Sequence, residues 1–334
     1  MNDSIFIALA GFLTFFITMI VAPLVIMLMK RLKAGQVILG YVEQHSYKTG
    51  TPTIGGVMFV LPTIVVTMIL GYSKLSLVAA AILFSYAVLG FLDDFIKIKH
   101  KQNLGLRAYQ KVIGQFGIAL IVAIFCFKNQ FIGSAINVPF TDKIFEMQWW
   151  YIPFVIFIYI AVTNSVNLTD GLDGLATTVS IVYFLTFLII ILFQLKGFKY
   201  FGQAQEYAEM KGLAVFTACL IGGLLGFLWQ NSYPAKIMMG DTGSLAIGGS
   251  VVTVAVFTKN PLIILTVGIM FVVSCISVVM QVIYFKLTKK RIFLMSPYHH
   301  HLEKKGCHES KIVAFYSIVT VLAAVIALIS AGVI

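Results

Sequence analysis

Long apolar stretches that are nearly free of charge recur along the whole chain. Most of them approach the ~20 residues that a helix needs to cross a bilayer. Of the 334 residues, 60% are hydrophobic and 11% are charged, whereas soluble domains carry about a quarter charged residues. The pattern predicts an all-α membrane protein. Because no polar or Pro/Ser-rich linker interrupts it, we expect a single domain over residues 1–334.

The hydropathy pattern predicts ten membrane-spanning helices. The predicted ranges are 4–29, 54–71, 75–96, 110–127, 149–168, 174–195, 212–230, 244–258, 261–287 and 312–333. The eighth range is short and the ninth is long, so we expect the ninth helix to bend or protrude. Polar and apolar residues alternate within 131–148, and this alternation predicts a small hairpin.

Lysine and arginine are distributed unequally between the two sides of this topology. If the first loop is cytoplasmic, 17 of the 24 basic residues fall inside and 7 fall outside. The positive-inside rule then places both termini on the outer side. The net charge of +11 is thus explained by topology, and we expect no nucleic-acid binding. All six histidines fall inside, as do five aspartates, namely Asp93, Asp94, Asp170, Asp173 and Asp241.

Two adjacent acids, Asp93 and Asp94, close the third predicted span. Carboxylates directly after apolar residues are costly at membrane depth and need compensation. Lys97 follows at helical spacing and lies on a neighbouring face. The pair is either an interfacial cap or part of a site.

Two further aspartates lie in a Gly-rich turn between the fifth and sixth spans, after Asn164 and Asn167. Asp170 and Asp173 are three residues apart and can face the same way around the turn. Glycines at such a turn let the backbone come close to a ligand. One of the two aspartates could serve as an N-cap of the sixth helix. A cap does not explain the other aspartate or the two asparagines, which favours a binding role for them.

Asp241 opens the eighth span within Gly240-Asp-Thr-Gly-Ser244. A helix N-terminus with small residues is suited to phosphate. A carboxylate there can cap the helix or hold Mg²⁺, which typically takes one or two carboxylates together with substrate phosphates. The sixth and eighth helices both begin on the predicted inner side, so two positive helix ends point at the same layer.

The last basic loop contains three consecutive histidines, His299, His300 and His301, before Lys304 and Lys305. Consecutive histidines diverge in direction, which disfavours a zinc site and favours several donors to an acidic substrate. A solvated loop is the alternative. Together with the aspartates, these residues suit a phosphorylated substrate bridged by magnesium, because phosphoryl transfer needs mainly positioning and charge neutralisation.

Five motifs in order give the chain a close resemblance to a known family. They are Lys48-Thr-Gly-Thr-Pro-Thr-Ile-Gly-Gly56, Asp93-Asp-Phe-Ile-Lys97, Asn167-Leu-Thr-Asp-Gly-Leu-Asp-Gly174, Pro234-Ala-Lys-Ile-Met-Met-Gly-Asp-Thr-Gly-Ser244 and Pro297-Tyr-His-His-His-Leu-Glu303. The chain resembles the polyprenyl-phosphate N-acetylhexosamine-1-phosphate transferases over essentially its whole length. The triple histidine favours the muramoyl-pentapeptide branch over the GlcNAc- or GalNAc-phosphate branch.

The resemblance implies an enzyme of the bacterial inner membrane with its active site on the cytoplasmic face. It would transfer phospho-MurNAc-pentapeptide from UDP-MurNAc-pentapeptide to undecaprenyl phosphate, giving lipid I and UMP. It also implies that Asp241 ligates Mg²⁺, that Asp93 deprotonates the lipid phosphate, and that Asp94 supports the metal and the phosphates. Lys97 and Lys111 would hold phosphate charge. The substrate-binding residues would be Lys48, Asn167, Asp170 and Asp173, with Asn231 and Gln281 nearby and His299, His300 and His301 at the rim.

Several alternatives stay open at this point. Met238 stands where the family has an aromatic that stacks on uracil, and a thioether can also cover a ring. A GlcNAc-1-phosphate transferase is the nearest rival function. An ion-coupled transporter is disfavoured because its acids are expected near the bilayer midplane in repeated halves. Direct attack competes with a covalent phospho-sugar enzyme, and the sequence does not decide between a monomer and a homodimer.

Overall fold

The protein is a bundle of helices with one small hairpin. The computed structural model describes residues 2–32, 50–100 and 105–334. Its helices are α1 (Asp3–Arg31), α2 (Val57–Leu70), α3 (Lys74–His100), α4 (Ala108–Lys128), α5 (Tyr151–Thr169), α6 (Leu175–Tyr200), α7 (Ala204–Asn231), α8 (Gly240–Phe257), α9 (Ile264–Val267), α10 (Ile269–Thr288), α11 (Tyr298–Lys304) and α12 (Glu309–Ser330). Short 3-10 turns at Gln148–Trp150 and Pro261–Ile263 lead into α5 and α9.

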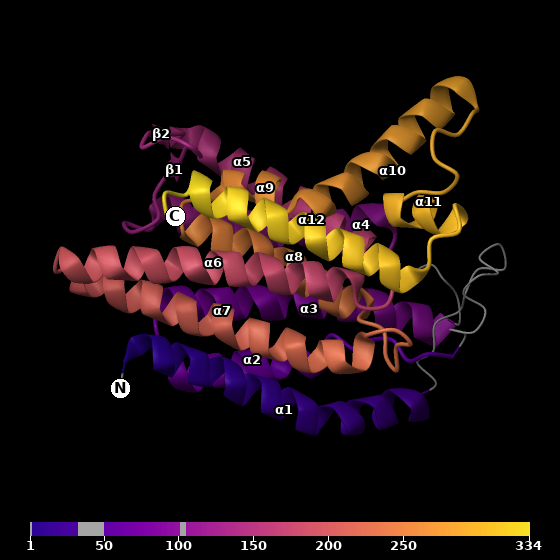
Figure 1. Ribbon diagram of the computed structural model, residues 1–334, viewed down its shortest axis with the longest axis horizontal. Helices are drawn as coiled ribbons and strands as arrows, with labels where there is room; N and C mark the ends of the chain where they lie inside the picture. The colour runs from indigo at the N-terminus through magenta and orange to yellow at the C-terminus, as the bar shows by residue number, and fades with distance from the viewer. Residues whose placement is uncertain (1, 33–49, 101–104) are drawn as a thin grey trace.

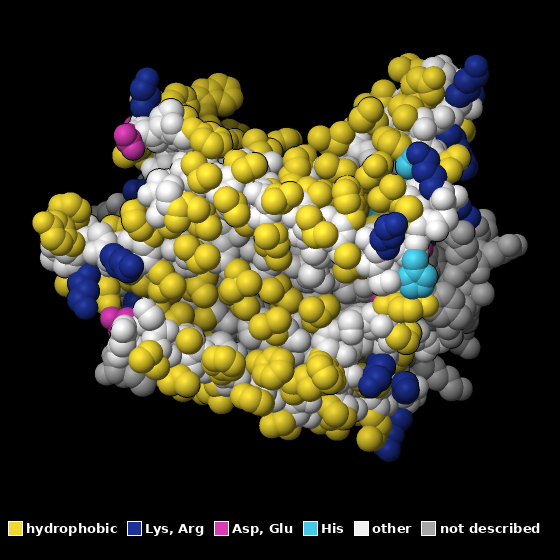
Figure 2. Space-filling model, viewed as in Figure 1, with side chains coloured by type: hydrophobic (Ala, Val, Ile, Leu, Met, Phe, Trp, Pro, Cys, Tyr) yellow, Lys and Arg dark blue, Asp and Glu magenta, His cyan; other side chains and the backbone are white. Residues whose placement is uncertain are grey.

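Within the described ranges, nine helices are long and apolar enough to cross a membrane. Each of the ten predicted ranges contains an apolar helix, but α2 has only 14 residues, which corresponds to about 21 Å. The all-α prediction is therefore confirmed, and the chain has the helices of a multi-pass membrane protein. Figure 2 agrees with this, because hydrophobic side chains cover the visible middle of the bundle while Lys and Arg lie towards its two ends.

The helices differ in how far they are enclosed by the others. Buried residues make up 89% of the apolar stretch of α8 and 83% of that of α7, but only 33% of that of α1. Helices α7 and α8 therefore form the interior of the bundle, and α1 lies at its edge (Figure 1). The first turn of α8 is consequently held inside the protein, where it can be surrounded by groups from other helices.

The ninth predicted span is broken, as expected from its length. Helix α9 ends at Val267, Gly268 follows, and α10 begins at Ile269. Figure 1 shows α10 inclined to the other helices and protruding from the bundle beside α11. The prediction that this span bends or protrudes is confirmed.

The predicted hairpin is also confirmed. Strands β1 (Ala135–Asn137) and β2 (Ile144–Glu146) pair antiparallel, with Ile136 opposite Phe145.

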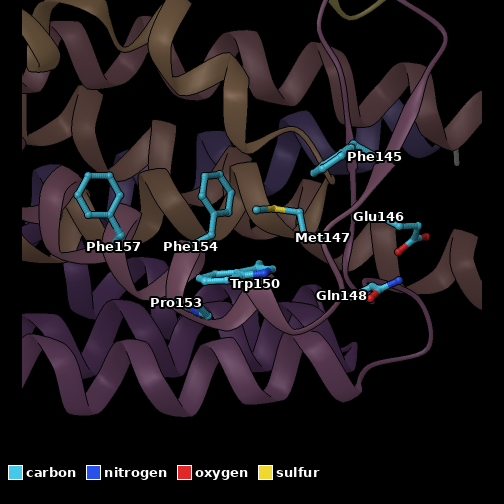
Figure 3. A pocket seen from close by; sticks show the side chains of 8 residues that line it. All are labelled: Phe145, Glu146, Met147, Gln148, Trp150, Pro153, Phe154 and Phe157. Carbon is cyan, nitrogen blue, oxygen red and sulfur yellow. The ribbon is translucent and has the colours of Figure 1, made fainter.

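Both chain termini and the hairpin lie at one end of the bundle, and α11 lies at the other (Figure 1). Beside the hairpin, Figure 3 shows the aromatic side chains of Trp150, Phe154 and Phe157 on one side of a pocket, with Glu146 and Gln148 on the other. Amphipathic aromatic rings are enriched at membrane boundaries.

Candidate active site

Three carboxylates from two helices meet where the C-terminal part of α3 approaches the N-terminus of α8. One oxygen each of Asp93, Asp94 and Asp241 lies within 4.8 Å of the others. Glycine at position 90 makes this approach feasible, because a Cβ there would lie 2.1 Å from the carbonyl oxygen of Asp241. Two motifs separated by almost 150 residues in the sequence thus form one acidic cluster.

Asp94 is held by the first turn of α8. Its carboxylate accepts hydrogen bonds from the backbone N–H of Asp241 (3.1 Å), and from the N–H (2.9 Å) and hydroxyl (2.7 Å) of Thr242. These N–H groups are among those that a helix start leaves unpaired. Asp94 therefore caps a helix to which it does not belong, and it fixes the backbone that carries Asp241.

Asp241 is surrounded by donors. Lys111 Nζ lies 2.8 Å and Lys97 Nζ 3.2 Å from its Oδ2 atom. Asn167 Nδ2 donates to its Oδ1 atom at 2.8 Å and also lies 2.8 Å from the Ser244 hydroxyl oxygen. Helices α3, α4 and α5 thus each contribute one polar side chain to the same carboxylate.

Asp93 has a different environment from its neighbour. Its Oδ2 atom lies 2.5 Å from Lys97 Nζ, and its Oδ1 atom accepts the backbone N–H of Leu106 at 2.9 Å. Asp93 is only 3% exposed, whereas the Lys97 side chain is 31% exposed. The carboxylate is therefore fixed by the protein, while its partner ammonium reaches solvent.

The donor set of the cluster fits a hard divalent cation. Carboxylate oxygens are the ligands that Mg²⁺ prefers, usually one or two per ion with phosphate and water completing the shell. Two lysine ammonium groups lie against these oxygens and neutralise part of their charge, so a divalent cation would have to take the place of at least one of them. The cluster can hold a cation on Asp241 together with Asp93 or Asp94.

The turn containing Asp170 and Asp173 lies beside this cluster, between α5 and α6. The Oδ2 atom of Asp173 accepts the backbone N–H of Ala235 at 2.9 Å, and the Asp173 N–H donates to a carboxylate oxygen of Glu309. Asn231 Oδ1 accepts the N–H of Gly174 at 3.1 Å. The two predicted binding residues Asp173 and Asn231 therefore also hold the turn, the loop before α8 and the start of α12 together.

The histidine loop packs against the same turn. A Cβ added at Gly171 would lie 2.3 Å from Nε2 of His299, which is fully buried. His300 Nδ1 lies 2.6 Å from Glu303 Oε2. The turn around Asp170 and the loop around His299 are therefore in contact in the structure. The histidines of this loop differ in exposure and in hydrogen-bond partners.

His301 is oriented by its neighbours on the loop and α11. Its ring stacks on Tyr298, and its Nδ1 atom accepts the N–H of Leu294 at 3.1 Å. Partial burial and the charge of Lys305 lower the pKa of His301 below its ordinary value. A neutral ring with an accepting Nδ1 atom follows from both observations.

The remaining predicted residues have varied positions. Gln281 on α10 accepts the N–H of Phe293 through Oε1 at 2.9 Å and so holds the chain leading to the histidines. Met238 is buried, and its N–H donates to Pro52 at 2.8 Å. Lys48 lies outside the described residues.

Three residues of this region were not identified from the sequence: Thr242, Ser244 and Glu309. Thr242 and Ser244 belong to the motif that carries Asp241, and their hydroxyls contact Asp94 and Asn167. Glu309 is buried although it is charged. Its only sequence signal is an acid in the first turn of the last apolar helix, which reads equally well as a helix-dipole contact.

A bundle of helices long and apolar enough to cross a membrane, with buried aspartates, lysines and helix N-termini at one end, defines a multi-pass membrane protein whose charged cluster can accommodate a phosphorylated ligand. The family described as glycosyl transferase family 4 matches residues 75–259, which include every aspartate discussed above. Phospho-N-acetylmuramoyl-pentapeptide-transferases are 42% identical in Clostridium novyi (95% of this chain, 94% of the relative), 42% in Thermoanaerobacter sp. strain X514 (95% and 96%) and 43% in Caldanaerobacter subterraneus (95% and 96%). The chain belongs to glycosyl transferase family 4 and, within it, to the family of these transferases.

Proposed function

We propose that this protein transfers phospho-MurNAc-pentapeptide from UDP-MurNAc-pentapeptide to undecaprenyl phosphate, producing lipid I and UMP. The observation that carries the proposal is the convergence of Asp93, Asp94 and Asp241 within 4.8 Å, with Lys97 and Lys111 on the same carboxylates. The names of relatives that are 42% identical over 95% of the chain support the choice of substrate.

The proposed topology places this chemistry at the cytoplasmic face of the bacterial inner membrane. It has ten spans, of which the 14-residue α2 and not the 18-residue α8 is the shortest, and both termini outside. The 17-to-7 division of basic residues supports this orientation, as does the position of both termini at the end away from α11 (Figure 1). A lipid phosphate at the membrane boundary and a soluble nucleotide sugar would then both reach the cluster.

The site residues divide the work as follows. Mg²⁺, held by Asp241, would neutralise charge on the phosphates. Asp93 accepts the proton of the lipid phosphate, which then attacks the β-phosphorus of the nucleotide sugar. The new P–O bond forms as the bond to the α-phosphate oxygen breaks, and UMP leaves. Asp94 keeps Asp241 in place through the α8 amides.

The other residues bind the substrate. Lys97 can turn from the carboxylates towards the phosphates, because its side chain is 31% exposed against 4% for Asp93. Lys111, which is as buried as its partner Asp241, holds phosphate charge from its present position. The nucleoside is bound at Asn167 and at the turn with Asp170 and Asp173. The predicted pocket is completed by Lys48, Asn231, Gln281 and the three histidines, and Met238 covers the base.

The test is UMP release by the purified protein in detergent, measured with and without undecaprenyl phosphate. UDP-MurNAc-pentapeptide should support release only when the lipid and Mg²⁺ are both present, and EDTA should abolish it. Preference for UDP-GlcNAc would instead establish the GlcNAc-1-phosphate transferase. Release that ignores the lipid would overturn the transferase, and a phospho-MurNAc adduct on the protein before lipid is added would overturn direct attack.

A further inference from the structure

A pocket with apolar and charged walls lies at the opposite end of the bundle from the acidic cluster, beside the chain termini. It has a volume of about 500 Å³ and lies between the start of α1, the last turns of α6 and the start of α7. Its wall combines apolar and cationic side chains, including Ile189, Leu192, Phe193, Lys196, Lys199 and Tyr207. The transfer reaction proposed above uses none of these residues.

The lining residues of α6 form one continuous face that changes from apolar to cationic. Ile189, Phe193 and Lys196 recur at helical spacing of three and four residues. Lys196 stands about 10 Å along the helix from Ile189, and Lys199 stands one turn further on. Figure 2 shows Lys and Arg side chains at this end of the molecule, beside the hydrophobic surface of the helices.

The lysines that line this pocket outnumber its carboxylates by two to one. Its one carboxylate, Asp3, is 2.5 Å from Lys211 Nζ and accepts the hydroxyl of Tyr207. Over residues 2–32, 50–100 and 105–334, neither Lys196 nor Lys199 forms an ion pair within 4 Å, and Lys199 acts on Asp3 only from a longer distance. The N-terminus of α1, which is the positive end of a helix dipole, lines the same pocket. The pocket is therefore suited to an anion.

We propose that this pocket binds one anionic glycerophospholipid. The headgroup phosphate lies between the ammonium groups of Lys196 and Lys199, and one acyl chain follows Ile189, Leu192 and Phe193. Simple snorkelling of two lysines at a helix end would not need the pocket. A free phosphate would leave its apolar wall bare, and Phe193 is 47% exposed on a helix that faces lipid.

The test uses the full chain purified in a neutral detergent and analysed by native mass spectrometry after incubation with dioleoyl phosphatidylglycerol or dioleoyl phosphatidylcholine. The wild type should retain one phosphatidylglycerol in preference to phosphatidylcholine. Each lysine near an anionic lipid contributes about 1 kcal/mol, so K196Q/K199Q should bind the anionic lipid about thirty-fold more weakly. The control variant K128Q/K143Q removes two exposed lysines that lie near the hairpin and outside the pocket. It should bind phosphatidylglycerol as the wild type does.

Further variants separate this lipid from other occupants. Leu192→Trp keeps both charges and fills the acyl part of the pocket, so it should also weaken retention. The proposal would be overturned if K196Q/K199Q and K128Q/K143Q lost affinity for phosphatidylglycerol equally, or if the wild type showed no preference for the anionic headgroup. Competition by glycerol phosphate would identify a free-phosphate site instead. Dimers that carry no lipid and dissociate in K196Q/K199Q would assign the pocket to a second copy of the chain.

Discussion

The approach of α8 to α3 at Gly90 gives the sharpest test of the site. In Gly90→Ala, the new Cβ would lie 2.1 Å from the Asp241 carbonyl oxygen and 2.6 Å from the Thr242 nitrogen, whereas ordinary contact begins at 3.4 Å. The start of α8 must therefore move by more than about 1 Å, and a displacement of this size in a catalytic group lowers turnover about 100-fold. Overpacking also destabilises a core by about 1–3 kcal/mol.

The matched control is Gly117→Ala on α4, where a Cβ would meet nothing within 4 Å. Alanine is favoured over glycine inside a helix by up to about 1 kcal/mol, so this variant should unfold at an equal or higher temperature and keep its activity. UMP release and thermal unfolding in detergent measure both effects. Wild-type turnover by folded Gly90→Ala protein would refute the idea that close helix contact positions Asp241.

Three further predictions test individual side chains. Asp93→Asn should lose turnover but still bind UDP-MurNAc-pentapeptide in a calorimetric titration, and retained turnover would exclude Asp93 as the base. Glu309→Ala removes the acceptor of the Asp173 N–H, a contact to a charged group that contributes about 1.5–3 kcal/mol. It should raise KM at least tenfold with less effect on kcat, and an effect on kcat alone would contradict this role. The pKa of His301, followed by histidine-selective NMR, should lie below its ordinary value and rise in Lys305→Gln. The Leu294 contact should be lost as the pH falls through that pKa, and an unchanged pKa in the variant would exclude the Lys305 charge as a cause.

Local sequence patterns were sufficient for much of the fold. Long apolar stretches located the helices, and the excess length of the ninth range predicted the break that falls at Gly268. The alternation within 131–148 predicted the pairing of β1 with β2. These features are determined by residues close together in the chain, so the local sequence pattern contains the information needed to predict them. The short α2 was not foreseen, because the apolar run of 54–71 continues beyond the ends of the helix.

Contacts between distant segments were predicted less completely. The sequence placed Asp94 and Asp241 in one layer but did not show that Asp94 caps α8, because a cap from another helix leaves no local pattern. Glu309 was missed for the same reason, since its partner Asp173 lies 136 residues away in the chain. The roles of Asp170, Asn231 and Gln281 in substrate binding stay predictions.

The charged groups of the site differ in how firmly their neighbours hold them. Asp93 and Asp94 accept backbone N–H groups and have side chains only 4% exposed, so they keep their positions when a ligand arrives. Lys97 is 31% exposed and is held by carboxylates alone among the described residues. A phosphate can draw such a lysine away, which would uncover negative charge at the place proposed for the divalent cation. Cation binding and phosphate binding should therefore favour each other, and Mg²⁺ should raise the affinity of the wild-type protein for the nucleotide sugar more than that of Lys97→Met.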